Sequence, residues 1–313
     1  MKIAVVGAGA LGSVLAALLH EAGLDVVLVE RDPDKVRHVA RNGLRLEGVS
    51  GDRLVRPRIV SVPSEAGKVD LAIVAVKSYD TAAAIPTLEE ILSPGGVALT
   101  LQNGIGNYEV LNDALPGRVL LGTTIMGAMT LGLGNIRHTG FGDTHLGEAD
   151  GPILERTRVL AAVLEKMKSG PVHVVDNAIG CVWSKLIVNA AVNAPASLLR
   201  VRNGDLPSTG EGRALIGAVV RECSGVTEAK GVRLIFDDPE DRVLAVCQGT
   251  ANNVNSMLQD ILAGRRTEID FINGSIAREA EQLGLSAPVN RTLTQLIKAL
   301  EATTERRVPD APH

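Results

Sequence analysis

The chain has 313 residues, which exceeds one typical domain, so two domains are expected. Its formal net charge of -4 argues against a nucleic-acid or anionic-membrane partner. Three cysteines, far apart and odd in number, indicate neither a metal site nor a disulfide framework and fit a reducing cytosol. The chain opens without a signal-peptide pattern, and no apolar run reaches the ~18 residues that span a bilayer. We therefore expect a cytoplasmic protein.

The first thirty residues show the pattern of a nucleotide site. Residues 2–6 are typical of a buried parallel strand, an apolar helix follows to about residue 22, and residues 25–30 predict a second strand. Between strand and helix lies a G-x-G-x-x-G turn, formed by Gly7, Ala8, Gly9, Ala10, Leu11 and Gly12. Its glycines permit a tight turn, approach of the backbone to a pyrophosphate, and close packing of helix on strand. A glycine turn alone is weak evidence, but in this context it predicts dinucleotide binding.

The end of the second strand leaves the choice of dinucleotide open. Glu30 would accept hydrogen bonds from a ribose 2′-hydroxyl, whereas Arg31 would bind a 2′-phosphate. Neighbouring residues of an extended chain point to opposite sides, so the two cannot easily both face the ribose. These residues alone do not decide between NADH and NADPH.

Two further polar residues follow predicted strands. Lys77 comes after the strand at 70–76, and Asn103 after the strand at 97–101. Open α/β sheets bind their ligands at the carboxyl ends of strands, which favours a site, although Asn-Gly is also an ordinary turn dipeptide. Residues 119–146 predict strands, written VLLGTTIMGAMT, NIRHTG and DTHLG, and the domain boundary is expected near residue 175.

The second half predicts only helices, over about 177–200, 209–230, 239–262, 268–283 and 290–303. In the first, Lys185, Asn189 and Asn193 lie four residues apart and form one stripe on an otherwise apolar helix. A buried lysine without a carboxylate in its own helix is costly unless it is paired elsewhere or lies at a wet cleft. The alternative is a lysine that reaches solvent beside two surface amides.

Two polar clusters interrupt the later helices. The predicted helix at 239–262 is crowded by Asn252, Asn253, Asn255 and Ser256, although Asn is a poor helix former. Glu268 falls in the first turn of the next predicted helix, where Thr267 and Asp270 have capping-box spacing, and position alone favours plain capping. Residues 304–313 are expected to form a frayed tail.

Taken together, these motifs resemble the ketopantoate reductases (2-dehydropantoate 2-reductases) over nearly the whole chain. The matching segments are GAGALG, Lys77-Ser78, Gln102-Asn103-Gly104, Gly122-Thr123-Thr124, the helix from Trp183 to Asn193, Asn203-Gly204, NVNSMLQD and TEIDFING. The glycine turn is shared with many dehydrogenases, whereas the lysine helix and the last two segments are specific to this family.

The resemblance implies an α/β fold with an amino-terminal Rossmann domain at 1–175 and an all-helical domain at 176–313, with the active site between them. It implies NADPH-dependent reduction of 2-dehydropantoate to (R)-pantoate in pantothenate and coenzyme A synthesis. Lys185 matches the proton donor and Glu268 a carboxylate on the cofactor side of the active site. The matched cofactor contacts are Arg31 for the 2′-phosphate, Lys77, Asn103 and Ala128; the matched substrate contacts are Asn103, Asn189, Asn193, Asn203, Asn253 and Ser256.

Two other functions stay open at this stage. One is reduction of a different 2-oxo acid on the same scaffold, and the other is a non-catalytic dinucleotide sensor, which would not need the lysine and asparagine stripe. Glu30 beside Arg31 keeps NADH open as the cofactor. The expected partner is a small 2-oxo acid, and the oligomeric state is left open, with a homodimer as one alternative.

Overall fold

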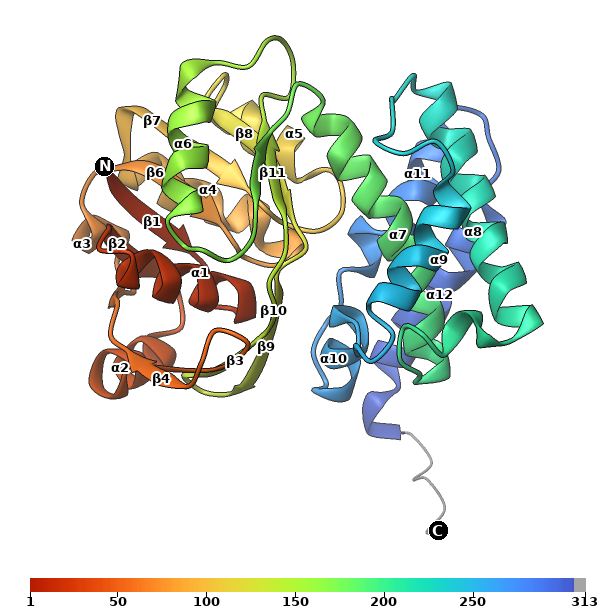
Figure 1. The fold of residues 1–313 in the computed structure, drawn as a ribbon, viewed down its shortest axis with the longest axis horizontal. Coiled ribbons are helices and arrows are strands. Elements are labelled where there is room, and N and C mark those ends of the chain that lie inside the picture. The colour runs from red at the N-terminus through yellow and green to blue at the C-terminus, as the bar shows by residue number, and fades with distance from the viewer. Residues whose placement is uncertain (307–313) are drawn as a thin grey trace. The chain divides into compact units, whose positions relative to one another are not determined.

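The computed structural model describes residues 1–306 and divides the chain into two compact units, one of residues 1–182 and one that begins at Trp183 (Figure 1). The first is built on β-sheets and the second on helices. Among residues 1–306, no helix is long and apolar enough to cross a membrane.

The first unit is organised around a sheet in the order β12-β11-β8-β7-β6-β1-β2-β5. Its strands are β1 (Lys2–Val6), β2 (Asp25–Val29), β5 (Arg58–Val60), β6 (Val69–Val74), β7 (Leu92–Thr100), β8 (Val119–Thr124), β11 (Thr144–Gly147) and β12 (Val172–Val174). All neighbours pair in parallel except β8 and β11, which are antiparallel. The central strands are buried on both faces, which is why they are continuous runs of Val, Ile, Leu and Ala.

Helices cover both faces of this sheet. They are α1 (Ala10–Glu21), α2 (Pro33–Asn42), α3 (Pro63–Ala66), α4 (Thr81–Ile91), α5 (Asn107–Ala114) and α6 (Glu155–Glu165), with a short 3-10 helix η1 (Ser78–Asp80) after β6. Alternate residues of each strand point to opposite faces. Thus Val5 of β1 packs in the core that includes α1 and α6, whereas Val6 packs in the core that includes α3, α4 and α5.

A second, smaller sheet has the order β4-β3-β10-β9 and shares the α1 core. Its strands are β3 (Leu44–Gly48), β4 (Arg53–Val55), β9 (Gly127–Gly132) and β10 (Asn135–Gly140). The predicted strand run after residue 119 is therefore divided at residues 125–126, because β8 belongs to the large sheet and β9 to the small one.

The second unit contains helices only among its described residues. They are α7 (Ala178–Leu199), which begins in the first unit, η2 (Leu206–Ser208), α8 (Gly210–Ala229), α9 (Pro239–Gly249), α10 (Ser256–Leu262), η3 (Ile269–Phe271), α11 (Asn273–Gln282), α12 (Pro288–Ala302) and η4 (Thr304–Arg306). Helix α8 packs against α9, α11 and α12. Its Glu222 carboxylate accepts hydrogen bonds from the backbone amides of Val289 and Asn290, at 2.8 and 2.9 Å, and so fixes the start of α12.

Two helix predictions were wrong in detail. The helix predicted over 239–262 ends at Gly249, and a loop precedes α10 because Asn255 caps it by accepting the Leu258 amide at 3.0 Å. The helix predicted from residue 268 starts as η3, and α11 follows only from Asn273. Of the predicted frayed tail, residues 304–306 form η4, and residues 307–313 lie outside the described part of the chain.

Candidate active site

The glycine turn between β1 and α1 has the close contacts that a dinucleotide cradle requires. Gly7 has φ +105°, and a Cβ there would lie 2.8 Å from the Val76 amide nitrogen. A Cβ on Gly12 would lie 1.9 Å from the Gly7 carbonyl oxygen, so side chains are excluded at both positions. Gly9 is different, because it is exposed and a Cβ there would meet only the Ala75 oxygen, at 4.0 Å.

The open position at Gly9 is also the start of α1. Gly9 is the N-cap residue and has no side chain to cap the helix. The backbone amides of the first helical turn are therefore available to donate hydrogen bonds to an anion at the turn, as they do at phosphate sites of other helices. These features fit the pyrophosphate of a dinucleotide, and Gly7, Ala8, Gly9, Ala10, Leu11 and Gly12 are the residues that would hold it.

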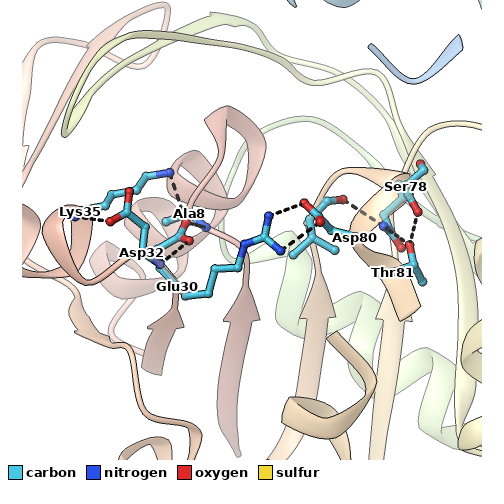
Figure 2. A network of polar contacts seen from close by, with 10 residues as sticks. Ala8, Glu30, Asp32, Lys35, Ser78, Asp80 and Thr81 are labelled. Carbon is cyan, nitrogen blue, oxygen red and sulfur yellow. Dashed lines mark hydrogen bonds and ion pairs between the residues drawn. The ribbon is translucent and has the colours of Figure 1, made fainter. Parts of the chain in front are cut away.

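Glu30 and Arg31, which follow β2, have different partners. Figure 2 shows Glu30 beside Ala8, Asp32 and Lys35, and Asp80 apart from them. The Glu30 carboxylate accepts from the amides of Ala8 at 3.0 Å and Asp32 at 3.1 Å, and it pairs with Lys35 Nζ at 3.2 Å. Arg31 forms a bidentate ion pair with Asp80, in which Nη1 and Nη2 each lie 3.0 Å from a different carboxylate oxygen. The side chains thus diverge, as expected for neighbours on an extended chain.

The strand ends that carry Lys77 and Asn103 are joined by partly buried hydrogen bonds. The backbone oxygen of Asn103 accepts from Ser78 Oγ at 2.7 Å and from Asn107 Nδ2 at 3.0 Å. Gln102 Nε2 donates to the Val76 carbonyl at 2.9 Å, across from the end of β7 to the end of β6. The structure therefore places Lys77 and Asn103 at adjacent strand ends and leaves both partly exposed.

Ala128 lies on the small sheet rather than at the end of a large-sheet strand. It is in β9, opposite His138 of β10, and it is partly buried against the core that contains α1. His138 is completely buried and packs edge-on against Phe141 with ring centroids 5.1 Å apart.

On α7, the stripe of Lys185, Asn189 and Asn193 lies on a helix whose other faces are mostly buried. Burial lowers the pKa of the Lys185 ammonium from 10.5 to about 8, and the negative charge of Glu268 partly opposes that shift. The partly buried lysine thus has its carboxylate partner outside its own helix, as one of the sequence alternatives requires. Asn193 is nearly fully buried, and Asn189 is partly exposed.

Glu268 does not cap a helix. It occupies the N-cap position of η3, but its side chain makes no capping hydrogen bond, and it is 6% exposed. The Thr267 amide instead donates to Glu301 Oε1 of α12 at 2.7 Å, so the predicted capping box with Asp270 was wrong. A buried carboxylate that raises the pKa of a buried lysine is an arrangement found at catalytic sites.

Asn203 and Asn253 are brought together by the backbone. The Asn203 amide donates to the Asn253 carbonyl at 3.0 Å, and Asn203 Nδ2 donates to Thr250 Oγ1 at 3.0 Å. The backbone of Gly204 lies so close to Ala251 that a Cβ on Gly204 would be 2.5 Å from the Ala251 Cβ. Asn203 is buried in this junction, while the side chains of Asn253 and Ser256 are exposed beside it.

Two buried asparagines position these residues. Asn255 Oδ1 accepts from Ser197 Oγ of α7 at 3.3 Å, which ties the loop before Ser256 to the lysine helix. Asn273 Nδ2 donates to the Ala190 carbonyl of α7 at 3.0 Å and thereby fixes α11 against the same helix. The signal for Asn255 in the sequence was the excess of asparagine around it, and that for Asn273 was its place in the segment TEIDFING; their partners are 58 and 83 residues away. No group of three or more His, Cys, Asp or Glu within residues 1–306 is arranged to hold a metal ion.

Comparison with known proteins gives the same picture across both units. Residues 3–151 match the family model "Ketopantoate reductase PanE/ApbA", and residues 177–301 match the model of its C-terminal part. The chain belongs to the ketopantoate reductase family. This confirms the resemblance, and an amino-terminal Rossmann-like unit followed by a helical unit confirms the predicted fold class.

Individual relatives match almost end to end. A 2-dehydropantoate 2-reductase of Archaeoglobus fulgidus is 36% identical over 303 residues, which cover 96% of this chain and 98% of the relative. The crystal structure of a PanE/ApbA family ketopantoate reductase from Ralstonia eutropha is 33% identical, covers 97% of this chain and 100% of its own, and superimposes with a TM-score of 0.89. A D-mandelate dehydrogenase bound to NADH and anilino(oxo)acetate is 27% identical with a TM-score of 0.90 and covers 97% and 100%. As a member of this reductase family, the chain is an oxidoreductase.

Proposed function

We propose that this chain is a cytoplasmic, NADPH-dependent 2-dehydropantoate 2-reductase that forms (R)-pantoate for pantothenate and coenzyme A synthesis. The observation that carries the proposal is the Lys185 ammonium, partly buried on α7, with a pKa of about 8 under the influence of Glu268. The relatives named 2-dehydropantoate 2-reductase support the substrate. Three free, buried cysteines suit a reducing compartment.

A nicotinamide dinucleotide supplies the hydride when it is bound at the glycine turn. Reduction of the ketone carbon would place negative charge on the ketone oxygen. The Lys185 ammonium stabilises that charge and then donates its proton to the oxygen. With a pKa near 8, Lys185 is charged at neutral pH yet gives up its proton far more readily than an ordinary lysine.

Neutral side chains orient the substrate in this proposal. Asn189, Asn193, Asn203, Asn253 and Ser256 offer hydrogen bonds to the carboxylate and hydroxyl of a small polar acid. They do so without placing a second cation beside Lys185, which would lower its pKa further. Asn103, at the end of β7, contacts both cofactor and substrate, and Lys77 and Ala128 are further cofactor contacts. Arg31 binds the 2′-phosphate of NADPH.

The decisive experiment removes the lysine. Lys185→Ala is expected to lower kcat by about 10²- to 10⁴-fold, the usual contribution of a positioned proton donor, with the Kd of NADPH unchanged. Lys298→Ala is the matched control, because this lysine lies in the same unit but is exposed and pairs with Asp270. A Lys185→Ala enzyme that keeps most of its activity would refute the assignment.

One other function has a specific observation in its favour. The structural likeness to D-mandelate dehydrogenase makes reduction of an aromatic 2-oxo acid the second candidate. Its chemistry would use the same lysine, so only substrate preference separates the two. A comparison of kcat/KM for 2-dehydropantoate and phenylglyoxylate decides between them. Cofactor binding with turnover of neither substrate would instead support a dinucleotide sensor.

A further inference from the structure

The Arg31–Asp80 ion pair spans the glycine turn. Arg31 follows β2, and Asp80 ends η1, which follows β6. In the sheet, β1 lies between these two strands, and its carboxyl end leads into Gly7. The pair therefore crosses the edge of the sheet where the adenosine part of a dinucleotide binds in folds of this type (Figure 2).

Asp80 occupies the edge of Arg31 that would recognise a phosphate. Both terminal nitrogens of the guanidinium donate to Asp80, each at 3.0 Å. A planar guanidinium binds a carboxylate and a phosphate with the same two-pronged geometry. A 2′-phosphate must therefore displace Asp80 from Arg31, or share the guanidinium with it. The Arg31 side chain is 72% exposed, and ion pairs this exposed are weak enough to be exchanged.

The charged residues around Arg31 also disfavour a 2′-phosphate. Glu30 and Asp32 lie beside Arg31 in the sequence, and Lys35 is paired with Glu30. With Asp80 this gives three carboxylates against two cations around the predicted 2′ position. The three carboxylates oppose the binding of a phosphate that carries close to two negative charges, whereas they do not oppose the binding of a ribose hydroxyl.

We propose that Asp80 is a specificity-determining residue of the dinucleotide site, which weakens binding of 2′-phosphorylated cofactors by competing for Arg31. The inference rests on the proposed nicotinamide-dependent function, and it deepens that function by naming the residue that limits selectivity for NADPH over NADH. Removal of the Asp80 charge should release Arg31 for the phosphate and leave a 2′-hydroxyl cofactor almost unaffected.

The test measures binding rather than turnover. The Kd values of NADPH, NADH and adenosine 2′,5′-bisphosphate are determined by calorimetry for the wild type and for Asp80→Asn. The variant should bind NADPH and the bisphosphate about twofold to fivefold more tightly, the range expected when the competing ion pair of an exposed arginine is removed, with the Kd of NADH changed less than about 1.5-fold. Asp80→Gln provides a second variant in case the first does not fold.

Asp34→Asn is the control, because it removes the same charge and also releases a nearby arginine, Arg37, from its ion pair. The Asp80 effect should disappear in an Arg31→Ala background. Equal changes for NADPH and NADH would overturn the proposal, and so would weaker NADPH binding, which would mean that Asp80 holds Arg31 in place for the phosphate. Failure of the proposed function appears separately, as absent turnover of 2-dehydropantoate with cofactor binding intact.

Discussion

The pKa of Lys185 gives a quantitative expectation for the pH dependence of reduction. Burial brings this pKa to about 8, and the ammonium is the form that donates the proton. For reduction, kcat/KM should therefore follow the charged fraction of the free enzyme, about nine-tenths at pH 7, half at pH 8 and a tenth at pH 9. If the lysine had an ordinary pKa, kcat/KM would not change with pH up to about pH 10. The assay is initial-rate oxidation of the reduced nicotinamide between about pH 6 and pH 10.

Replacement of Glu268 tests the cause of that pKa. The Glu268 carboxylate raises the pKa of Lys185, so Glu268→Gln should lower it below the wild-type value of about 8. The alkaline limb of the profile then moves to lower pH, and the loss of activity is larger at pH 8 than at pH 6.5. A Glu268 that only supported the fold would lower the rate by the same factor at every pH. That uniform loss, or a wild-type rate that stays constant to pH 10, would refute the reasoning.

Three further substitutions test the site and the core. Lys185→Met should abolish reduction yet raise the free energy of unfolding at pH 7 by at most about 3 kcal/mol, measured by urea titration, because the depressed pKa of Lys185 means a loss of stability that develops as pH falls from about 10.5 to about 8 and is fully present at pH 7. Gly12→Ala should weaken cofactor binding at least about tenfold and lower the Tm, since the new Cβ would meet the Gly7 oxygen at 1.9 Å. Burial lowers the pKa of His138, so the wild type should lose stability as pH falls below about 6.5, and His138→Leu should lose less, since the pKa of His145 is also lowered by burial; thermal unfolding at pH 5 and pH 8 would show the difference.

The parts of the fold that could be predicted are those with local causes. The run from β1 through the glycine turn to α1 and β2 depends on strand hydrophobicity and on glycines that allow backbone contacts, and both are visible within thirty residues. The stripe on α7 likewise follows from helical spacing. In each case the structure places the elements within a few residues of their predicted bounds.

The parts that could not be predicted depend on partners far away in the chain. Asn255 was expected inside a helix, but its side chain caps α10 and accepts from Ser197, which is 58 residues earlier. Residues 249–255 are mostly polar, and their excess of asparagine was a sign of the break, but it does not give the distant partner that fixes the loop. Similarly, alternation along β2 predicted that Glu30 and Arg31 diverge, but Asp80, the partner of Arg31, lies 49 residues away.

Glu268 shows how such a distant contact changes the interpretation of a functional residue. From its position, the carboxylate was expected to help cap a helix, which would have explained its presence without any role in chemistry. The Thr267 amide is satisfied instead by Glu301, 34 residues later. Capping therefore does not account for Glu268, and its burial would be costly without a positive charge to offset it. Lys185 supplies that charge, and the carboxylate in turn raises the pKa of the lysine, so each ion makes the burial of the other tolerable. Loss of the Glu268 charge should therefore lower the pKa of Lys185.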